Sequence, residues 1–185
     1  FILWASGSVW RELIHQVESY DGKDKNINPS NIIGVANSSY CIFHSKWINK
    51  SLLSTISESR EWALKSFNKH WKKYSKAEEL LEIIQPKGTQ EEIIFVDVTA
   101  WKKELLDFHL KVLNHSNHFL VTANKNPISL YSVDDFKKLT QEYGRYDSNT
   151  TVMWWGGILN FIKERENIHD SIKKIEWVFS GTLWY

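Results

Sequence analysis

Few side chains in this sequence combine a reactive type with a spacing that indicates chemistry. His109, His115 and His118 lie close together, but the sequence has no HxxxH pair and no cysteine cluster beside them, so surface histidines are expected rather than a metal site. Cys41 has no histidine at a spacing known for catalytic thiols, which favours a buried thiol. Asp97 is expected to order the turn after a strand rather than to act in catalysis.

The segment Ser6–Ser8 could bind phosphate, because it joins a short apolar strand, Phe1–Ala5, to an amphipathic helix, Val9–Tyr20. A dinucleotide-binding turn uses glycines so that the backbone can approach the pyrophosphate and the helix can pack against the strand. This turn keeps only Gly7. A strand–turn–helix unit with aromatic packing is therefore an equal alternative.

Composition bounds the class of protein. The chain has 185 residues, 42% of them hydrophobic, which predicts one folded domain with a sizeable core, or one domain and part of a second. The net charge of +1, with both signs mixed along the chain, argues against an electrostatic nucleic-acid binder, and the basic stretch Lys69–Lys76 is interpreted as a solvated helix face. A single cysteine fits a reducing compartment, and no apolar run approaches the ~20 residues that span a membrane.

Hydrophobic periodicity predicts strands that alternate with helices. Continuous apolar strands separated by helices are typical of a parallel sheet covered on both faces, the doubly wound α/β class. After the first strand and helix, further strands are predicted at Ile32–Ala36, Ile93–Val98, Phe119–Thr122, Thr150–Met153 and Ile172–Phe179, and a strand extension or short helix at Tyr40–Phe43. Helices are predicted at Ser51–Tyr74 (interrupted near Ser57–Glu61), from the capping box Ser75/Glu78 to Ile84, and at Trp101–Asn114, Ser132–Tyr143 and Ile158–Lys163.

Such folds bind ligands at the carboxyl ends of their parallel strands. We therefore expect Phe1–Ala5, Ile32–Ala36, Ile93–Val98 and Phe119–Thr122 to be neighbouring parallel strands of one sheet. The functional site is expected in the segments that follow the strands, which are Ala5–Ser8, Asn37–Ser39, Thr99–Trp101, Ala123–Asn126 and Met153–Gly157.

Taken together, the sequences at the strand ends resemble the corresponding stretches of a known protein family. The stretches IIGVANS (32–38), VDVTA (96–100), VTANK (121–125) and IEWVFSGTL (175–183) occur in the order and at the intervals of the nucleotide-binding half of homoserine dehydrogenases, including the dehydrogenase part fused to aspartate kinase. The resemblance covers essentially the whole chain. It implies a Rossmann domain and the NAD(P)-dependent interconversion of aspartate semialdehyde and homoserine, on the route to threonine and methionine.

The resemblance assigns roles residue by residue. Lys125 of the Asn-Lys pair matches the lysine that the family uses in catalysis, and an ammonium there could stabilise and protonate the oxyanion that forms when hydride reaches an aldehyde. A lysine without these flanking motifs would be interpreted as a solvated loop residue. The positions that match cofactor-binding residues are Ser6, Gly7, Ser8 and Val9 in the phosphate loop, Asn37 and Ser38 near the adenosine ribose, Thr99 and Ala100 near the nicotinamide, and Asn124.

The sequence also departs from the family pattern. Tryptophan stands where the family has glycine at Trp4, Trp10, Trp155 and Trp177, and where it has small residues at Trp101 and Trp184. A tryptophan at position 10 should either fill the pyrophosphate space or hold the first helix away from the first strand. The family's cation-binding Glu is absent near Asn149, so no metal site is expected.

These observations predict residues 1–160 as a Rossmann-like nucleotide-binding domain and 161–185 as the start of a catalytic region. The leading hypothesis is an NAD(P)-dependent homoserine dehydrogenase with a weak preference for NADP, because no acidic residue follows the second strand. The alternative is a non-catalytic homologue whose cofactor site is occluded, and the chain as written is expected to bind NAD(P) weakly or not at all. The resemblance further implies a small-molecule substrate, a homo-oligomer in the full-length protein, and the cytoplasm, or a plastid in a plant, with neither nucleic acid nor membrane as a partner.

Overall fold

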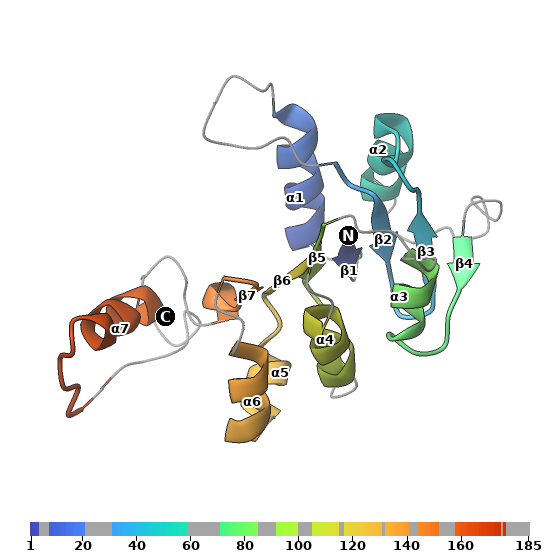
Figure 1. Ribbon diagram of the computed structural model, residues 1–185. Helices are drawn as coiled ribbons and strands as arrows, with labels where there is room; N and C mark the ends of the chain where they lie inside the picture. The colour runs from blue at the N-terminus through green and yellow to red at the C-terminus, as the bar shows by residue number, and fades with distance from the viewer. Residues whose placement is uncertain are drawn as a thin grey trace.

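A mostly parallel sheet organises the molecule (Figure 1). The computed structural model describes residues 1–3, 8–20, 31–58, 71–84, 92–99, 105–114, 117–130, 132–140, 144–151, 158–174 and 176. Within these ranges the strands stand in the order β4-β3-β2-β1-β5-β6-β7. Their bounds are β1 Ile2–Leu3, β2 Gly34–Ala36, β3 Tyr40–Phe43, β4 Trp71–Lys73, β5 Ile93–Asp97, β6 His118–Thr122 and β7 Tyr146–Asp147.

The four strands expected to be neighbours are neighbours, and all are parallel. β1 lies between β2 and β5, with Ile2 opposite both Val35 and Val96, and β6 pairs with the other side of β5. β7 extends this parallel set, whereas β3 and β4 add antiparallel strands at the opposite edge. The doubly wound class predicted from the sequence is therefore confirmed.

Helices cover both faces of the sheet. In Figure 1, α1 (Ser8–Ser19) and α2 (Lys50–Glu58) lie on the upper face, and α3 (Glu79–Ile84), α4 (Leu105–Asn114), α5 (Lys125–Leu130) and α6 (Val133–Thr140) lie on the lower face. This is the arrangement that right-handed crossovers produce when the chain winds outward from β1 in two directions. The helix α7 (Ile158–Asn167) lies beyond β7, apart from the sheet.

The core has two parts because side chains alternate between the faces of each strand. Ile2, Val35 and Ile42 face α1 and α2 and pack with Ile14, Leu53 and Ile56. Leu3, Ala36, Cys41 and Phe95 face the other way, toward α3 and α4. Strands inside a parallel sheet are apolar toward both faces, which agrees with the almost continuous hydrophobic run of β5, although Ile94 is 49% exposed.

Between residues 40 and 74, the structure has paired strands at the edge of the sheet where the sequence pattern predicts helix. Tyr40–Phe43 is an antiparallel strand rather than a short helix, and Trp71–Lys73 pairs with it as β4, so the prediction of a helix through Tyr74 is wrong there. Residues 59–70 lie outside the described residues. The basic stretch ending at Lys76 accordingly includes an edge strand, with Lys72 and Lys73 exposed, and not a helix face.

Helix starts and the later elements differ in detail from the prediction. The carboxylate that accepts the backbone N–H of Ser75 belongs to Glu79 rather than Glu78. Ser132 and Asp135 form a reciprocal cap at α6, as expected for a helix opened at Ser132. Of the predicted strand at Thr150–Met153, residues 150 and 151 belong to a 3₁₀ helix, η2 (Asn149–Thr151), and residues 152 and 153 lie outside the described residues. Residues 172–174 of the predicted last strand are not in a strand.

Cys41 should not react in the folded protein. It is wholly buried, and burial raises the pKa of its thiol to about 11, against a smaller lowering by Lys72. Because the thiolate is the nucleophile, we expect negligible reaction with an aromatic disulfide reagent at neutral pH and complete reaction after denaturation. Rapid stoichiometric labelling of the native chain would show that β3 is not packed as described.

Candidate functional site

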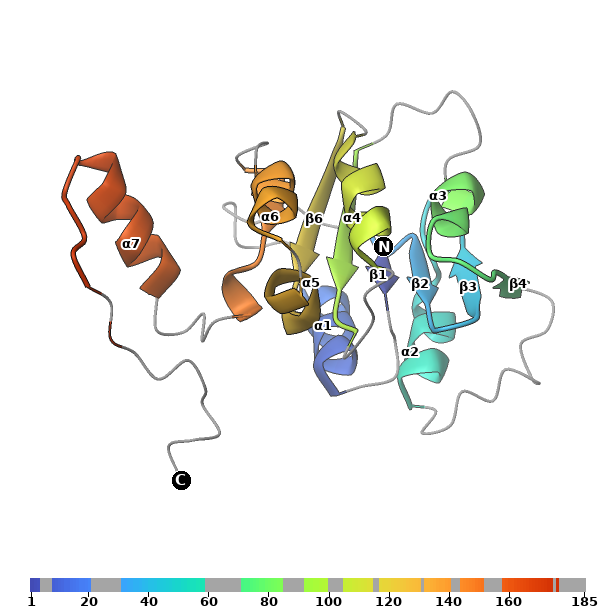
Figure 2. The same ribbon diagram turned by 90° about the horizontal axis from the view of Figure 1, so that it is seen from below.

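Polar side chains gather where β5 and β6 end, although most other residues of the two strands are apolar. Asp97, Thr99, Thr122 and Asn124 are all buried at this edge. Figure 2 shows both strands pointing to the same edge of the sheet, where α5 follows β6. A polar cluster in a buried position is stable only if its members are hydrogen-bonded to one another, and these are.

The carboxylate of Asp97 is the centre of this cluster. Its Oδ1 accepts the backbone N–H of Thr99 at 2.9 Å, and its Oδ2 accepts the hydroxyl of Thr122 at 3.2 Å. The Nε2 of His109, on α4, lies 3.1 Å from the same Oδ2. We call Asp97, Thr99, His109, Thr122 and Asn124 the strand-end network.

These contacts favour the ionised form of the Asp97 carboxyl. Burial by itself raises the pKa of the carboxyl, but the hydrogen bond and charge of His109 and the hydrogen bonds of Thr99 together hold that pKa below its usual value of 3.8. The carboxylate is therefore ionised at neutral pH and acts only as an acceptor, so the His109 Nε2 carries the proton between them. The His109 Nδ1 is buried and has no hydrogen-bond partner among the described residues.

Asn124 connects the two strand ends and begins α5. Its Nδ2 donates to the Thr99 Oγ1 at 2.8 Å, and its backbone N–H donates to the Thr122 Oγ1 at 3.1 Å. Its Oδ1 accepts the backbone N–H of Asn126 at 3.1 Å, which is the contact of a helix N-cap. Lys125 is the first residue of α5 and is exposed, so its backbone is fixed by the network while its ammonium faces solvent.

Of the residues proposed from the sequence, the structure joins Thr99 to Asn124 by a hydrogen bond and places Lys125 next to Asn124 in the chain. Asn37 follows β2, and its Oδ1 accepts the backbone N–H groups of Ser39 and Tyr40, while Ser38 is exposed. The Asn37 carbonyl also accepts the Tyr74 hydroxyl, so this residue shapes the turn between β2 and β3.

The phosphate-loop residues are described only in part. Ser8 and Val9 open α1, with the Val9 side chain 61% exposed in the first turn. Ser6, Gly7 and Ala100 lie outside the described residues. β1 ends at Leu3 and α1 begins at Ser8, so the strand–turn–helix unit expected from the sequence has its strand and its helix in place.

Trp10 lies under α1 rather than in front of it. Its side chain is 1% exposed and belongs to the core formed with Ile2, Ile14 and Val35. Of the two positions expected for this indole, the structure shows the one between the helix and the sheet. The space before the helix N-terminus is therefore not filled by Trp10.

The expectation that the histidines lie on the surface is wrong for two of them. His109 and His118 are wholly buried, and His115 lies outside the described residues. The spacing of Leu105, Phe108 and Val112 shows that position 109 shares the apolar face of α4, which was the signal available in the sequence. The expectation that Asp97 orders the turn after its strand is confirmed, because its Oδ1 accepts the backbone N–H of Thr99.

The stability of the fold should decrease in acid because of Asp97. A carboxyl whose folded-state pKa lies below 3.8 adds stability that is present above that pH and is lost as the pH falls below it. We expect Asp97→Asn to lower the free energy of unfolding at pH 7 and to flatten its dependence on pH below about 4. Urea denaturation at several pH values measures both, with Asp107→Asn, an exposed acid on α4, as the control. Equal pH profiles for both variants would contradict the assignment.

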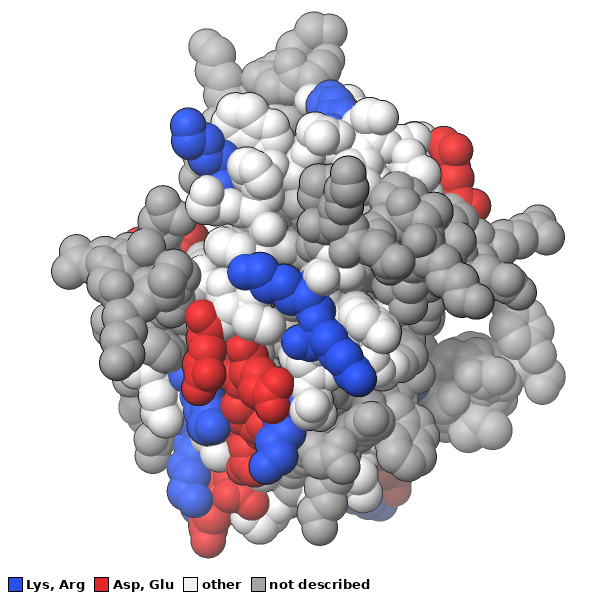
Figure 3. Space-filling model, turned by 90° about the vertical axis from the view of Figure 1, so that its right-hand side faces the viewer, with Lys and Arg blue, Asp and Glu red and all other residues white. Residues whose placement is uncertain are grey.

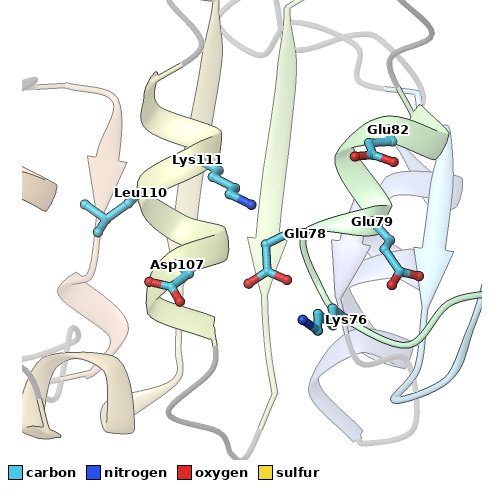
Figure 4. Close-up of a pocket in the computed structure, with 7 residues that line it drawn as sticks. All are labelled: Lys76, Glu78, Glu79, Glu82, Asp107, Leu110 and Lys111. Carbon is cyan, nitrogen blue, oxygen red and sulfur yellow. The ribbon is translucent and has the colours of Figure 1, made fainter.

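A hollow of about 470 Å³ lies between α3 and α4 (Figure 4), away from the strand-end network. Its lining is mostly charged, with carboxylates and lysines on both sides, and consists of Lys76, Glu78, Glu79, Glu82, Asp107, Leu110 and Lys111. Figure 3 shows acidic and basic side chains beside one another on the side that carries α2, α3 and β4. Within the described ranges no group of His, Cys, Asp and Glu has the arrangement of a metal site. The strand-end network is therefore the better candidate site.

Comparison with known proteins supports the fold. No protein-family model and no curated protein matches this sequence. Among solved structures, the chain is similar to a homoserine dehydrogenase from a hyperthermophilic archaeon in complex with NADPH, with 21% identity and a TM-score of 0.55 over 82% of this chain and 44% of that chain. It is also similar to the homoserine dehydrogenase of Thermoplasma acidophilum, with 16% identity and a TM-score of 0.57 over 82% and 43% of the two chains.

A protein of unknown function from Candida auris is similar too, with 17% identity and a TM-score of 0.52 over 82% of this chain and 38% of that chain. The chain spans less than half the length of each of these proteins. Every helix in the described ranges is too short or too polar to cross a membrane. The likeness in topology agrees with the fold expected from the sequence motifs, and the chain has a Rossmann-type fold similar to that of these homoserine dehydrogenases.

Proposed function

We propose that the protein containing this chain is an NAD(P)-dependent oxidoreductase that interconverts aspartate semialdehyde and homoserine. The observation that supports the proposal is the strand-end network, which ties Thr99, just after β5, to Asn124, the neighbour of Lys125. Parallel α/β folds bind their ligands at this edge of the sheet. The resemblance in sequence assigns these same three residues to the nicotinamide and catalytic positions. The likeness to a homoserine dehydrogenase with bound NADPH supports the cofactor class.

Groups of this chain are suited to bind the pyrophosphate and the nicotinamide of such a cofactor. The first turn of α1 has backbone N–H groups without intrahelical partners, which is the general basis of pyrophosphate binding at a helix N-terminus. Because the Trp10 indole lies in the core, it does not cover that end of the helix. Thr99 and Asn124 are buried and hydrogen-bonded to each other, so in this proposal they hold the two strand ends in place beside the nicotinamide.

Lys125 supplies the proton in the proposed reaction. The nicotinamide cofactor, when bound, donates a hydride to the aldehyde carbon or takes one from the alcohol. The Lys125 Nζ donates a proton to the carbonyl oxygen as that hydride adds, and takes it back in the reverse direction. An exposed lysine at the end of β6 can be reached by a substrate, which a buried one could not.

The remaining features of the proposal follow from the same resemblance. Asn37 and Ser38, rather than an acid, follow β2, which is consistent with a weak preference for NADP. We place the reaction in threonine and methionine synthesis, in the cytoplasm or a plant plastid, within a homo-oligomer of the full-length protein. The division between a nucleotide-binding domain at residues 1–160 and a catalytic region from residue 161 stays a prediction.

One observation favours a second candidate, a non-catalytic homologue that acts as a binding or scaffold module. Trp10 is a large, wholly packed side chain in the first turn of α1, where close contact between helix and strand would require a small residue. A helix held off the sheet would present its N–H groups in the wrong place for a pyrophosphate. The two candidates therefore differ in whether the chain binds NAD(P)H at all.

The site is tested by titrating NADPH into the isotope-labelled chain and following amide signals by NMR. At millimolar NADPH we expect the signals of Thr99, Asn124 and Lys125 to move, and that of Cys41 on β3 to stay. NADH should cause smaller changes at equal concentration. Shifts confined to β3 and α2, or none at any concentration, would contradict the proposed site.

A further inference from the structure

His109 is a polar residue that the packing of α4 does not require. It lies on the apolar face of the helix, wholly buried, between turns that carry Leu105, Phe108 and Val112. A leucine would fill such a position without the cost of burying an imidazole. The contact that offsets this cost is the hydrogen bond to Asp97, since the His109 Nδ1 has no hydrogen-bond partner among the described residues.

A continuous series of hydrogen bonds runs from His109 to the start of α5. The Asp97 Oδ2 is shared by His109 Nε2 and the Thr122 hydroxyl, and the Thr122 Oγ1 accepts the backbone N–H of Asn124. Asn124 then caps α5 through Asn126. Its side chain also returns to Thr99, whose backbone N–H is held by Asp97, so the series closes into a ring.

We infer that His109 is a positioning residue that fixes the backbone of Lys125 through Asp97, Thr122 and Asn124. His109 touches neither Lys125 nor the solvent-facing edge and acts only through this ring. The catalytic consequence rests on the proposed function, whereas the effect on the Asn124–Asn126 turn does not.

The physical reason is the number of hydrogen bonds that a buried carboxylate needs. Three donors satisfy the hydrogen-bonding capacity of the buried Asp97 carboxylate. The Thr122 hydroxyl then has a single favourable orientation, with its proton toward Asp97 and its lone pairs toward Asn124. Loss of the His109 donor leaves a buried charge with one partner fewer, and the ring must rearrange to satisfy it. A displacement of about 1 Å at a reacting group can cost about 10²-fold in rate, so a loosened turn would matter at Lys125.

Three variants separate positioning from packing. His109→Leu keeps the volume and removes the donor. His109→Gln keeps a side-chain N–H that can reach Asp97. Phe108→Leu weakens the packing of the same helix, where the Phe108 ring lies 5.7 Å from that of Phe95, without touching Asp97.

Amide hydrogen exchange in the labelled chain gives the direct readout. We expect His109→Leu to speed exchange at Asn124 and Asn126 by about tenfold or more relative to Cys41 on β3, and His109→Gln to restore protection. Phe108→Leu should change all three amides together. If His109→Leu also changes all three together, or leaves Asn124 and Asn126 protected, the inference is overturned.

A double-mutant cycle in the full-length protein tests the link to Lys125. His109→Leu should lower kcat by about tenfold with little change in KM, and should cause no further loss in a Lys125→Ala background. An equal loss in both backgrounds would show that His109 does not act through Lys125. If Lys125→Ala alone leaves turnover unchanged, the proposed function fails, and the exchange pattern still decides whether His109 positions the turn.

Discussion

In the full-length protein, Lys125→Ala is expected to lower kcat for aldehyde reduction by about 10²-fold or more. The oxygen of the substrate becomes an alkoxide as the hydride adds, and general acid catalysis at such a centre is worth about 10²–10⁴-fold. The network holds the backbone on both sides of Lys125, so removing the side chain should not disturb the fold. Steady-state rates with aspartate semialdehyde and NADPH measure the effect.

The exposed Lys111 on α4 is the matched control, since Lys111→Ala removes the same charge from a surface that does not border the strand ends. Lys125→Arg provides a second comparison, because it keeps the charge but holds its proton too tightly to act as an acid. Unchanged turnover in Lys125→Ala would refute the catalytic role, as would an equal loss in Lys111→Ala.

The second large effect concerns Trp10. We expect the chain as written to bind NADPH weakly, and Trp10→Gly combined with Trp4→Gly to bind it more tightly, because a glycine lets α1 approach the strand. The same change removes a packed core side chain, at a cost of about 3–5 kcal/mol, from a fold whose total stability is of the order of 5–15 kcal/mol. The variant should therefore melt at a lower temperature and gain more in Tm from NADPH than the parent chain.

Trp47→Gly is the control for this pair, since Trp47 is 55% exposed and its loss should affect neither packing nor NADPH binding to a comparable extent. Circular dichroism must show that the double variant is folded before its Tm shift is interpreted. Micromolar NADPH binding by the parent chain would contradict the prediction, and so would a folded double variant with no response to NADPH.

The sheet could be predicted from the sequence because its central strands carry their own signal. Runs such as Ile93–Asp97 are almost continuously apolar, which is typical of strands inside a parallel sheet, and helices come next in the chain after β1, β5 and β6. The antiparallel edge carried no such signal. Trp71–Lys73 is a strand because β3 offers it a hydrogen-bonding edge, and that partner lies far from it in the sequence.

Of the candidate site, the meeting of Thr99 and Asn124 could be predicted in the same way, and the roles assigned to the site residues stay predictions. Thr99 and Asn124 follow neighbouring parallel strands, so topology alone brings them to one edge, and the structure shows them hydrogen-bonded. His109 could not be assigned in this way. Its role depends on which face of α4 packs over the end of β5, and periodicity shows that a residue is buried without showing what it meets.

Homoserine-dependent reduction of NADP⁺ by the full-length protein tests the central claim most directly. We predict formation of the reduced cofactor that depends on both substrates, requires high NADP⁺ concentrations because Trp10 weakens binding, and is lost in Lys125→Ala. Absence of reduction in a protein whose Tm rises with NADPH would contradict the account, since it would show a bound cofactor without the chemistry assigned to the strand-end network.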